Sequence, residues 1–359
     1  MLNIKEIIVP NFEKVIEAQD TKSGLHCFIA IHNTSLGPAM GGTRIYPYNS
    51  PQDAFEDALK LGKAMTYKSA LAENGLGGGK AVIIANPKTQ KTKELLLSFG
   101  EVLNSLKGQF IAAEDVGSTP DDMAIIRKKT PFVGALPIDE SSGDPSRFTA
   151  WGIYRGIRAV AKKLWNSECL GKKIIAIQGL GSVGSKLANI LFWEGAYLII
   201  CDKDAKLVHE QSILYGAQVV DPKDFIDIRC DILSPCALGG IINDEAIPKL
   251  HCKAIAGAAN NQLADPKNGM ELMKRGILYA PDYVINAGGI INASVEFDPK
   301  GYDPKTARDR VNHIYDTLSL IFERADKEHK PTNIIADEVA EFKLKHSIGK
   351  RLQPIRFPS

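Results

Sequence analysis

The sequence predicts an α/β protein with two domains, and three observations lead to this fold class. The chain has 359 residues, of which 44% are hydrophobic and 24% are charged, a composition typical of a globular protein long enough for two domains. Short apolar runs alternate with amphipathic helical patterns, which indicates a parallel or mixed sheet covered by helices. The alternation resumes after a loop rich in Gly, Pro and Ser at residues 135–147, which suits a hinge between domains.

The composition argues against several classes of protein. The formal net charge is +2, so we expect neither a nucleic-acid-binding surface nor an acidic tail. No apolar segment approaches the roughly 20 residues that span a bilayer, and no signal peptide is recognisable. The six cysteines include no Cys-x-x-Cys pair. We therefore expect a reduced, cytoplasmic protein that binds no metal and no membrane.

The first 135 residues contain the elements of one α/β layer. Residues 27–32 (CFIAIH) are predicted to form a strand, followed by a glycine-rich turn at residues 36–44. The pattern of apolar residues at 51–65 predicts an amphipathic helix, and residues 95–106 predict another. A further strand is expected at residues 110–113.

The stretch at residues 65–87 holds two lysines, Lys68 and Lys80. Lys80 follows three glycines, which allow a turn and a close approach of backbone to a ligand, and precedes an apolar run expected to be a buried strand. A partly desolvated lysine has a lowered pKa, which makes it a candidate general base. Taken alone, a solvated surface lysine beside a flexible loop is the alternative.

Two further groups come at predicted strand ends, where α/β proteins place ligands. Gly41 and Gly42 can offer backbone N–H groups to an anion, although a simple tight turn explains them equally well. Asp115 follows the strand at residues 110–113. An acid there is a candidate catalytic group, with a helix cap or a surface charge as the alternative.

After the hinge, a helix is predicted at residues 149–164, and residues 173–178 (KIIAIQ) form a buried strand. A G-x-G-x-x-G motif follows the strand and precedes a helix at residues 185–194 and a second strand at residues 198–201. The motif consists of Gly179, Leu180, Gly181, Ser182, Val183 and Gly184. In this setting it predicts a Rossmann-type site that holds a pyrophosphate at the helix N-terminus, rather than a plain structural turn. Asp202 ends the second strand and is predicted to bind the adenosine ribose, which favours NAD over NADP.

The remaining segments continue the Rossmann pattern. Strands are expected at residues 230–233, 253–256 and 283–285, each ending in small residues suited to a nicotinamide or a ribose. Helices are expected at residues 305–329 and 334–345. We assign residues 1–140, with a C-terminal return at about 332–359, to one α/β domain. We assign residues 141–331 to a Rossmann-type NAD-binding domain.

Taken together, several motifs resemble the glutamate/leucine/phenylalanine/valine dehydrogenase family, and most closely its leucine-acting branch. The matching stretches are LGPAMGGTR (36–44), MTYK (65–68), GGGKAVIIANP (77–87), AEDVG (113–117), AGAANNQL (256–263) and APDYVINAGGIIN (280–292). The resemblance extends from about residue 10 to residue 340. It implies reversible oxidative deamination of an L-amino acid to a 2-oxo acid and ammonia, with NAD as cofactor.

The resemblance also implies roles for individual residues. Lys80 matches the catalytic lysine, Asp115 the acid that exchanges a proton with the amine, and Lys68 the lysine that holds the substrate carboxylate. Gly41 and Gly42 support that carboxylate through their backbone, and Asn261 contacts substrate. The residues expected to line the nicotinamide and its ribose are Thr149, Cys236, Ala237, Ala259 and Asn260.

The expected substrate follows from the pocket that the resemblance outlines. Its residues are Met40, Met65, Ala113, Ile290 and Ala293. Glutamate-acting relatives carry a lysine where Met40 stands, and burying an unpaired carboxylate costs several kcal/mol. Relatives that act on aromatic amino acids tend to have glycine at the Ala113 position. Leucine, valine and isoleucine are therefore expected, with phenylalanine or tryptophan as the alternative.

Two other functions are weighed against this one. A catalytically silent nucleotide-binding protein would have lost its catalytic residues, yet Lys68, Lys80 and Asp115 are all present. A 2-hydroxy acid dehydrogenase would need a suitable histidine, and His209 and His251 are both interpreted as surface residues of the nucleotide half. The family resemblance further implies a homo-oligomer, often an octamer. It also implies that residues 1–140 and the C-terminal return form the substrate-binding and oligomerisation domain, with the active site in the cleft between the two domains.

Overall fold

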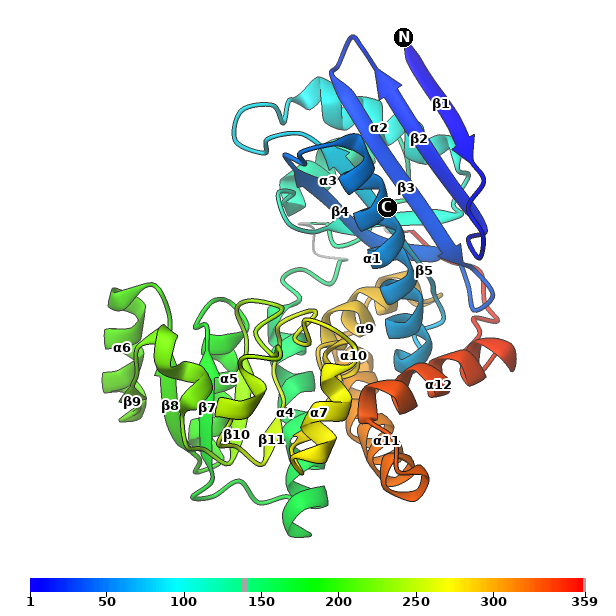
Figure 1. Cartoon of the computed structure of the whole chain (residues 1–359). Coiled ribbons are helices and arrows are strands. Elements are labelled where there is room, and N and C mark those ends of the chain that lie inside the picture. Colours follow the sequence, from blue (N-terminus) through cyan, green and yellow to red (C-terminus); the bar gives the residue numbers. More distant parts are fainter. Residues whose placement is uncertain (137–140, 358–359) are drawn as a thin grey trace. The chain divides into compact units, whose positions relative to one another are not determined.

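A computed structural model describes residues 1–136 and 141–357 of the chain (Figure 1). The chain divides into two compact units. The first consists of Met1–Asp144, Ala293–Pro304 and Ala340–Ser359, and the second of Pro145–Asn292 and Lys305–Val339. Compared with the expected domain boundaries, the first unit also includes Ala293–Pro304, and its C-terminal return begins at Ala340. Residues 137–140, part of the predicted hinge, lie outside the described residues.

The first unit is built on a six-stranded sheet with the order β1-β2-β3-β5-β4-β6. Its strands are β1 (Leu2–Ile7), β2 (Lys14–Asp20), β3 (Leu25–Asn33), β4 (Ala39–Tyr46), β5 (Gly77–Ile84) and β6 (Phe110–Glu114). The pairs from β1 to β5 are antiparallel, whereas β4 lies parallel to both β5 and β6. The sheet is therefore mixed, with β4 as an interior strand.

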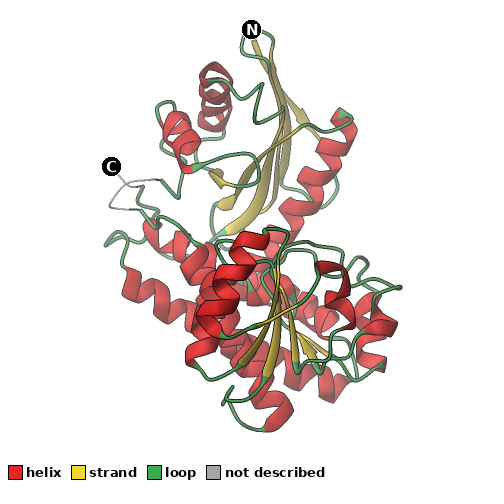
Figure 2. Cartoon of the chain, turned by 90° about the vertical axis from the view of Figure 1, so that its left-hand side faces the viewer, coloured by secondary structure: helices red, strands yellow, loops and turns green. Residues whose placement is uncertain are grey.

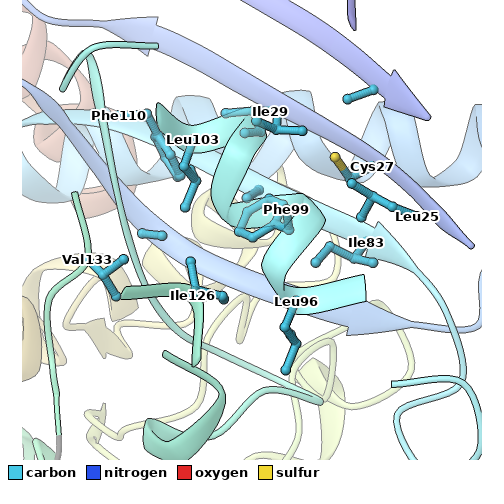
Figure 3. Close-up of a cluster of buried hydrophobic side chains, with 14 of the residues drawn as sticks. Leu25, Cys27, Ile29, Ile83, Leu96, Phe99, Leu103, Phe110, Ile126 and Val133 are labelled. Carbon is cyan, nitrogen blue, oxygen red and sulfur yellow. The ribbon is translucent and has the colours of Figure 1, made fainter. Parts of the chain in front are cut away.

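Side chains alternate between the two faces of the sheet along each strand, so both faces carry apolar residues. Helices cover both faces. Helix α1 (Pro51–Ala72) buries Ala54 and Ala58 against Phe28 and Val82 on one face. Helix α2 (Lys93–Ser105) and helix α3 (Pro120–Arg127) cover the other. Figure 3 shows Phe99 and Leu103 of α2 packed among the side chains of this second face. A strand residue that packs in the core under α2 points away from α1, and its two neighbours in the strand point toward α1.

The glycine-rich turn predicted at residues 36–44 is wrong, because residues 39–44 belong to β4, and the three glycines before Lys80 begin β5 instead of turning. A Cβ at Gly41 would overlap the Gly79 carbonyl, and one at Gly78 would overlap the backbone of Thr66 in α1. These glycines allow β4, β5 and α1 to approach closely. Close packing of neighbouring elements, and not turn formation, explains the glycines.

The second unit holds a parallel six-stranded sheet with the order β12-β11-β10-β7-β8-β9. Its strands are β7 (Ile174–Gln178), β8 (Tyr197–Cys201), β9 (Gln218–Val219), β10 (Ile232–Pro235), β11 (Ala254–Ile255) and β12 (Leu278–Tyr279). Helices lie on both faces of this sheet (Figure 2). Strand order runs outward in both directions from β7, so the sheet has the doubly wound arrangement expected from the sequence.

The helices of the second unit and the C-terminal segment agree in part with the prediction. They are α4 (Ser146–Trp165), α5 (Gly184–Trp193), α6 (Ala205–Tyr215), α7 (Asn268–Lys274), α8 (Asp282–Ile285), α9 (Gly288–Ser294), α10 (Pro304–Asn312), α11 (Ile314–Glu328) and α12 (Thr332–Lys345), with short 3₁₀ turns at Pro222–Asp227, Ile247–Lys249 and Val295–Phe297.

Two predictions about these elements are wrong. The strand expected at residues 283–285 is helix α8, because Pro281 ends the extended run and its carbonyl accepts bonds from the Val284 and Ile285 N–H groups. The single helix expected at residues 305–329 is divided in two at His313, whose N–H bonds the carbonyl three residues back, at Arg310.

Candidate active site

The face of the first sheet beneath α1 carries the polar residues of the site. In β5, Ala81 and Ile83 pack in the core under α2, while Val82 packs under α1. Lys80 therefore projects from the same face as Val82. On the neighbouring strands, Arg44 is paired with Val82, so it shares this face.

The buried Lys80 forms an ion pair with Asp115, whose side chain is 21% exposed. The Lys80 side chain is 6% exposed, and its Nζ donates to Asp115 Oδ2. Asp115 directly follows β6, and its backbone N–H is held by Ser118 Oγ at 2.9 Å. A Cβ at Gly42 would lie 2.6 Å from the Asp115 Cβ, so only glycine in β4 lets the carboxylate lie here.

The pKa of each partner is set by burial and by the neighbouring charges. Burial lowers the pKa of Lys80, and the like charge of Arg44 lowers it further, while the Asp115 carboxylate opposes both. Burial alone would raise the pKa of Asp115, but Lys80 and Arg44 together lower it below the ordinary value. The pair thus combines a carboxylate that stays ionised with a lysine that loses its proton more easily than an exposed one.

Sequence reasoning missed Arg44 as a site residue. Its Nε lies 3.3 Å from Asp115 Oδ2, and its NH1 donates to Asp57 Oδ2 at 2.9 Å. Tyr48 also donates its hydroxyl to Asp57. The sequence did contain one signal. Arg44 lies two positions after Gly42, so in a strand the two residues share one face of the sheet.

Lys68 and Met65 lie half-buried on α1, in the part of the helix that packs on β5. Between them, Thr66 is buried against β5, and its hydroxyl lies 3.3 Å from the Gly78 carbonyl and 2.9 Å from His32 Nδ1. The helix that carries Lys68 is therefore fixed to the strand that carries Lys80.

Three of the five predicted pocket residues come together in the first unit. Met40, Ala113 and Ala293 belong to one apolar cluster that also contains Leu76, Ile111, Phe297, Ile355 and Phe357. Met40 is 2% exposed and Ala293 is 7% exposed. Ile290, in contrast, belongs to the second unit, although it lies on the same helix α9 as Ala293.

The predicted dinucleotide loop lies at the carboxyl end of β7. Gly179 has a φ of +92°, which glycine adopts without strain, and a Cβ there would lie 2.7 Å from the Ala237 Cβ. A Cβ at Gly184 would overlap the Gly179 carbonyl, so the third glycine lets α5 begin beside the strand. Gly181 differs from both, because a Cβ there meets no atom within 4 Å. The open side of the loop is therefore at Gly181, with Ser182 and Val183 between it and α5.

Asp202 directly follows β8 and holds this loop in shape. Its Oδ2 accepts the Leu180 N–H at 2.6 Å, and its Oδ1 accepts the Asp204 N–H at 2.9 Å. A carboxylate oxygen has two lone pairs, so both oxygens keep acceptor capacity for a ligand hydroxyl.

Most of the other predicted cofactor residues follow the carboxyl ends of the parallel strands, which meet at one edge of the sheet. Cys236 and Ala237 follow β10, and Ala259 and Asn260 follow β11, where Asn261, the predicted substrate contact, comes next. The Asn260 side chain accepts from Asn286 Nδ2 at 2.8 Å, and the Asn261 N–H donates to Asp282 at 2.7 Å. Thr149 lies in the first turn of α4, and its hydroxyl donates to the Pro145 carbonyl.

The loop and the strand ends fit a bound dinucleotide. Val183, the N-cap residue of α5, has no side-chain acceptor for the first N–H groups, so the helix dipole at this end is available to a phosphate. Among the described residues, Gln178 Oε1 and Asn286 Oδ1 are buried acceptors without a hydrogen-bond partner, and both residues border this edge. Open backbone at Gly181 and unpaired acceptors nearby are the features that a nucleotide would use.

Metal-binding clusters and membrane-spanning helices are both absent from the described residues. Within residues 1–136 and 141–357, no three His, Cys, Asp or Glu side chains gather in a way that could hold a metal ion. None of the helices in this part of the chain is both long enough and apolar enough to cross a membrane.

Comparison with known proteins gives the class, a pyridine-nucleotide-dependent dehydrogenase, and the family. A model of the Glu/Leu/Phe/Val dehydrogenase dimerisation domain matches residues 11–132, and the Glutamate/Leucine/Phenylalanine/Valine dehydrogenase model matches residues 204–330. The chain belongs to this family of amino acid dehydrogenases, as the sequence motifs indicated.

Relatives of similar identity are named for different amino acids. Leucine dehydrogenase of Geobacillus stearothermophilus is 47% identical over 93% of this chain and 91% of its own. Phenylalanine dehydrogenase of Caldalkalibacillus thermarum is 43% identical over 94% of this chain and 92% of its own. The crystal structure of L-tryptophan dehydrogenase from Nostoc punctiforme matches with a TM-score of 0.84 and 43% identity, covering 94% of this chain and 97% of that one.

Proposed function

We propose that this amino acid dehydrogenase catalyses the reversible, NAD-dependent oxidative deamination of branched-chain L-amino acids, with Lys80 as general base. The observation that carries the proposal is the buried Lys80, paired with Asp115 in the same unit as the apolar cluster around Met40 and Ala113. A base of lowered pKa and an uncharged side-chain pocket are what deamination of an aliphatic amino acid requires.

The residues of the first unit divide the chemistry among them. Lys68 stays charged and holds the substrate α-carboxylate, assisted by backbone at Gly41 and Gly42. Strand β4 pairs with β5 before and after these two glycines, at Met40–Gly78 and Thr43–Ala81. The backbone of Gly41 and Gly42, which lies beside Lys80, is therefore a candidate contact for the substrate carboxylate.

Proton transfers are assigned to Lys80 and Asp115. When bound, NAD would accept the hydride that leaves the substrate Cα. Neutral Lys80 takes a proton from the water that adds to the imine carbon. Asp115 exchanges a proton with the amine, which leaves as ammonia. Burial would raise the pKa of Asp115, but the charges of Lys80 and Arg44 lower it and keep Asp115 ionised in the resting site.

The preference for NAD is proposed from Asp202. Its carboxylate, held by the Leu180 and Asp204 N–H groups, lies at the end of β8 where a ribose would bind. A negative charge there accepts bonds from the ribose hydroxyls and repels a 2′-phosphate, so NADP should bind less well. Thr149, Cys236, Ala237, Ala259 and Asn260 are proposed to line the nicotinamide half, and Asn261 to contact substrate.

Aliphatic substrates are proposed from Met40, Met65, Ala113, Ile290 and Ala293. Met40 offers no positive charge to a side-chain carboxylate, and Ala113 takes up space that an aromatic ring would need. Phenylalanine or tryptophan is the second candidate, because relatives named for these amino acids are nearly as similar as those named for leucine.

The test is the rate of NADH or NADPH formation by the purified protein at alkaline pH, with a panel of L-amino acids. Leucine, valine and isoleucine should give the highest kcat/KM with NAD, at least tenfold above the values with NADP. A maximum with phenylalanine or tryptophan would replace the substrate proposal and retain the reaction. Activity with NADP equal to that with NAD would contradict the role of Asp202.

We also propose a cytoplasmic homo-oligomer, an octamer by the family resemblance. All six cysteines, which lie within the described residues, are free thiols, as in a reducing compartment. The N-terminal family model is described as a dimerisation domain. Light scattering on the protein as it elutes from a size-exclusion column gives the mass directly. A mass of one chain, 39.1 kDa, would contradict the assembly.

A further inference from the structure

We propose that Arg44 is a positioning residue for the dehydrogenase reaction: it holds the Asp115 carboxylate in place beside Lys80, and Asp57 and Tyr48 hold Arg44. This inference rests on the roles proposed above for Lys80 and Asp115. It adds a group that acts through them and that the sequence motifs did not assign.

The geometry places two cations on one carboxylate oxygen. Lys80 Nζ donates to Asp115 Oδ2, and Arg44 Nε lies 3.3 Å from the same atom. The three residues come from different strands, since Lys80 lies in β5, Arg44 in β4, and Asp115 directly after β6. Strand β4 lies between β5, which carries Lys80, and β6, which precedes Asp115. Arg44 therefore contacts the ion pair from the strand between its two members.

Arg44 is itself fixed by a second carboxylate. Its NH1 donates to Asp57 of α1 at 2.9 Å, and the hydroxyl of Tyr48 donates to the same Asp57 oxygen. About a quarter of the Arg44 and Asp57 side chains is exposed. A planar guanidinium with donors in fixed directions can hold two carboxylates at once, which a lysine cannot reproduce.

The arrangement answers a requirement of the chemistry. Lys80 must lose its proton to act as a base, and Asp115 would then lose its nearest cation. Arginine remains charged throughout, so Arg44 keeps Asp115 ionised and in the same position in both states of Lys80. Without Arg44, the proton shared by the pair would be held more tightly.

The charged groups around Lys80 act in opposite directions. Arg44 from β4 lowers the pKa of Lys80, whereas Asp115 after β6 and Asp57 from α1 raise it.

Other groups on the elements packed around Lys80 complete its surroundings. On β3, Lys80 is paired with Ala30, and a hydrogen bond joins the nearby His32 to Thr66 of α1. Glu114 at the end of β6 has a raised pKa, caused by burial and by the charges of Asp144 and Asp115. Lys68 is a further cation on α1.

The test compares Arg44→Met, Arg44→Lys and Asp57→Asn with the wild type. One measurement is the pH profile of kcat/KM for amino acid oxidation. The other is the pH dependence of acetylation of Lys80 by acetic anhydride, followed by mass spectrometry of its peptide, which needs neither substrate nor cofactor. Arg324→Met is the matched control, because Arg324 forms an ion pair with Glu328 and Glu338 in the second unit.

The proposal predicts shifts of opposite sign. Arg44→Met should move the midpoint of both profiles to higher pH by about one unit, and lower kcat more than it changes KM. Arg44→Lys should restore the midpoint but not the full kcat. Asp57→Asn removes an anion, while its amide oxygen still accepts a bond from Arg44, so the midpoint should move to lower pH. Arg324→Met should leave both profiles unchanged.

An unchanged midpoint in Arg44→Met, or a shift of both variants in the same direction, would overturn the proposal. If Arg44→Met does not fold, Asp57→Asn and Arg44→Lys decide the matter, and an upward or absent shift in Asp57→Asn counts against it. A wild type inactive on every amino acid would refute the proposed function. The acetylation profiles would still decide the role of Arg44.

Discussion

Lys80 shows how a single buried residue acquires its chemistry from its neighbours. Burial lowers its pKa, one carboxylate opposes this shift, and the guanidinium of Arg44 supports it. The apolar side of the site also depends on a single neighbouring residue, because the size of Ala113 sets the space beside Met40. Both effects act over a few ångströms, so point substitutions test them directly.

Ala113→Gly should raise the ratio of kcat/KM for phenylalanine over leucine. The substitution removes one methyl group from the cluster around Met40, and such a change in a substrate pocket is worth about 1–3 kcal/mol, or roughly 10- to 200-fold. Steady-state kinetics with both amino acids measure the ratio.

The control for this prediction is Ala112→Gly. Ala112 is the preceding residue of β6 and faces the opposite core, under α2. It should lower the stability and leave the substrate ratio unchanged. An unchanged ratio in Ala113→Gly would show that Ala113 does not limit the size of the substrate.

Much of the chemistry at this scale was predictable from sequence. Lys80 beside an apolar run and Asp115 at a strand end both stood out, and the structure joins them in an ion pair. Arg44 was missed, because a sequence shows that an arginine is present but not which carboxylates it reaches. Its partners Asp57 and Asp115 are 13 and 71 residues away.

At the scale of elements, the glycines of the first sheet determine how closely β4, β5 and α1 approach one another. The Gly-rich stretches predicted as turns are strands, since composition alone does not reveal what packs against a missing Cβ. Apolar patterns located α2, α4, β7 and β8 closely, and they located the first part of α1, whereas β1, β2 and α6 were not predicted. The short strands β9 and β12 depend on their neighbours and were not predicted, and the strand expected at residues 283–285 is helix α8.

Gly78→Ala should destabilise the protein by about 1–3 kcal/mol, because its Cβ would overlap the Thr66 backbone and push α1 away from β5. Lys68 lies on that helix, so KM for the amino acid should rise as well. Denaturant unfolding and steady-state kinetics give the two values.

Gly181→Ala is the comparison for Gly78→Ala. A Cβ at Gly181 meets no atom within 4 Å, so its stability should stay within about 0.5 kcal/mol of the wild type. Binding of NADH should weaken, because the new methyl group fills the open side of the loop. Equal stability of the Gly78 and Gly181 variants would contradict the packing account.

At the scale of the whole molecule, the first unit is assembled from three separate segments of the chain. Arg351 from the last segment joins the other two. It donates to the Gly75 carbonyl at 3.1 Å, to the Phe297 carbonyl at 3.1 Å and to the Ser294 carbonyl at 3.3 Å. The segment that carries Ala293 is thereby attached to the first sheet. Sequence patterns did not predict that residues 293–304 belong to this unit, because contacts so distant in sequence leave no local signal.

Arg351→Met should lower the stability by about 2–4 kcal/mol, since several buried carbonyls lose their charged donor. The C-terminal segment should become sensitive to proteases, which limited proteolysis followed by mass spectrometry detects. Lys350→Met, at an exposed neighbouring position, is the control and should behave as the wild type. Equal protease resistance of the two variants would show that Arg351 does not secure the segment.

The most direct test of the account is the rate of NADH formation from leucine by Lys80→Ala beside the wild type. Loss of general base catalysis should lower kcat by about 10²- to 10⁴-fold, while NADH binding, measured by fluorescence, stays the same. A variant that binds NADH and keeps more than a tenth of the wild-type kcat would contradict the assignment of Lys80 as the base.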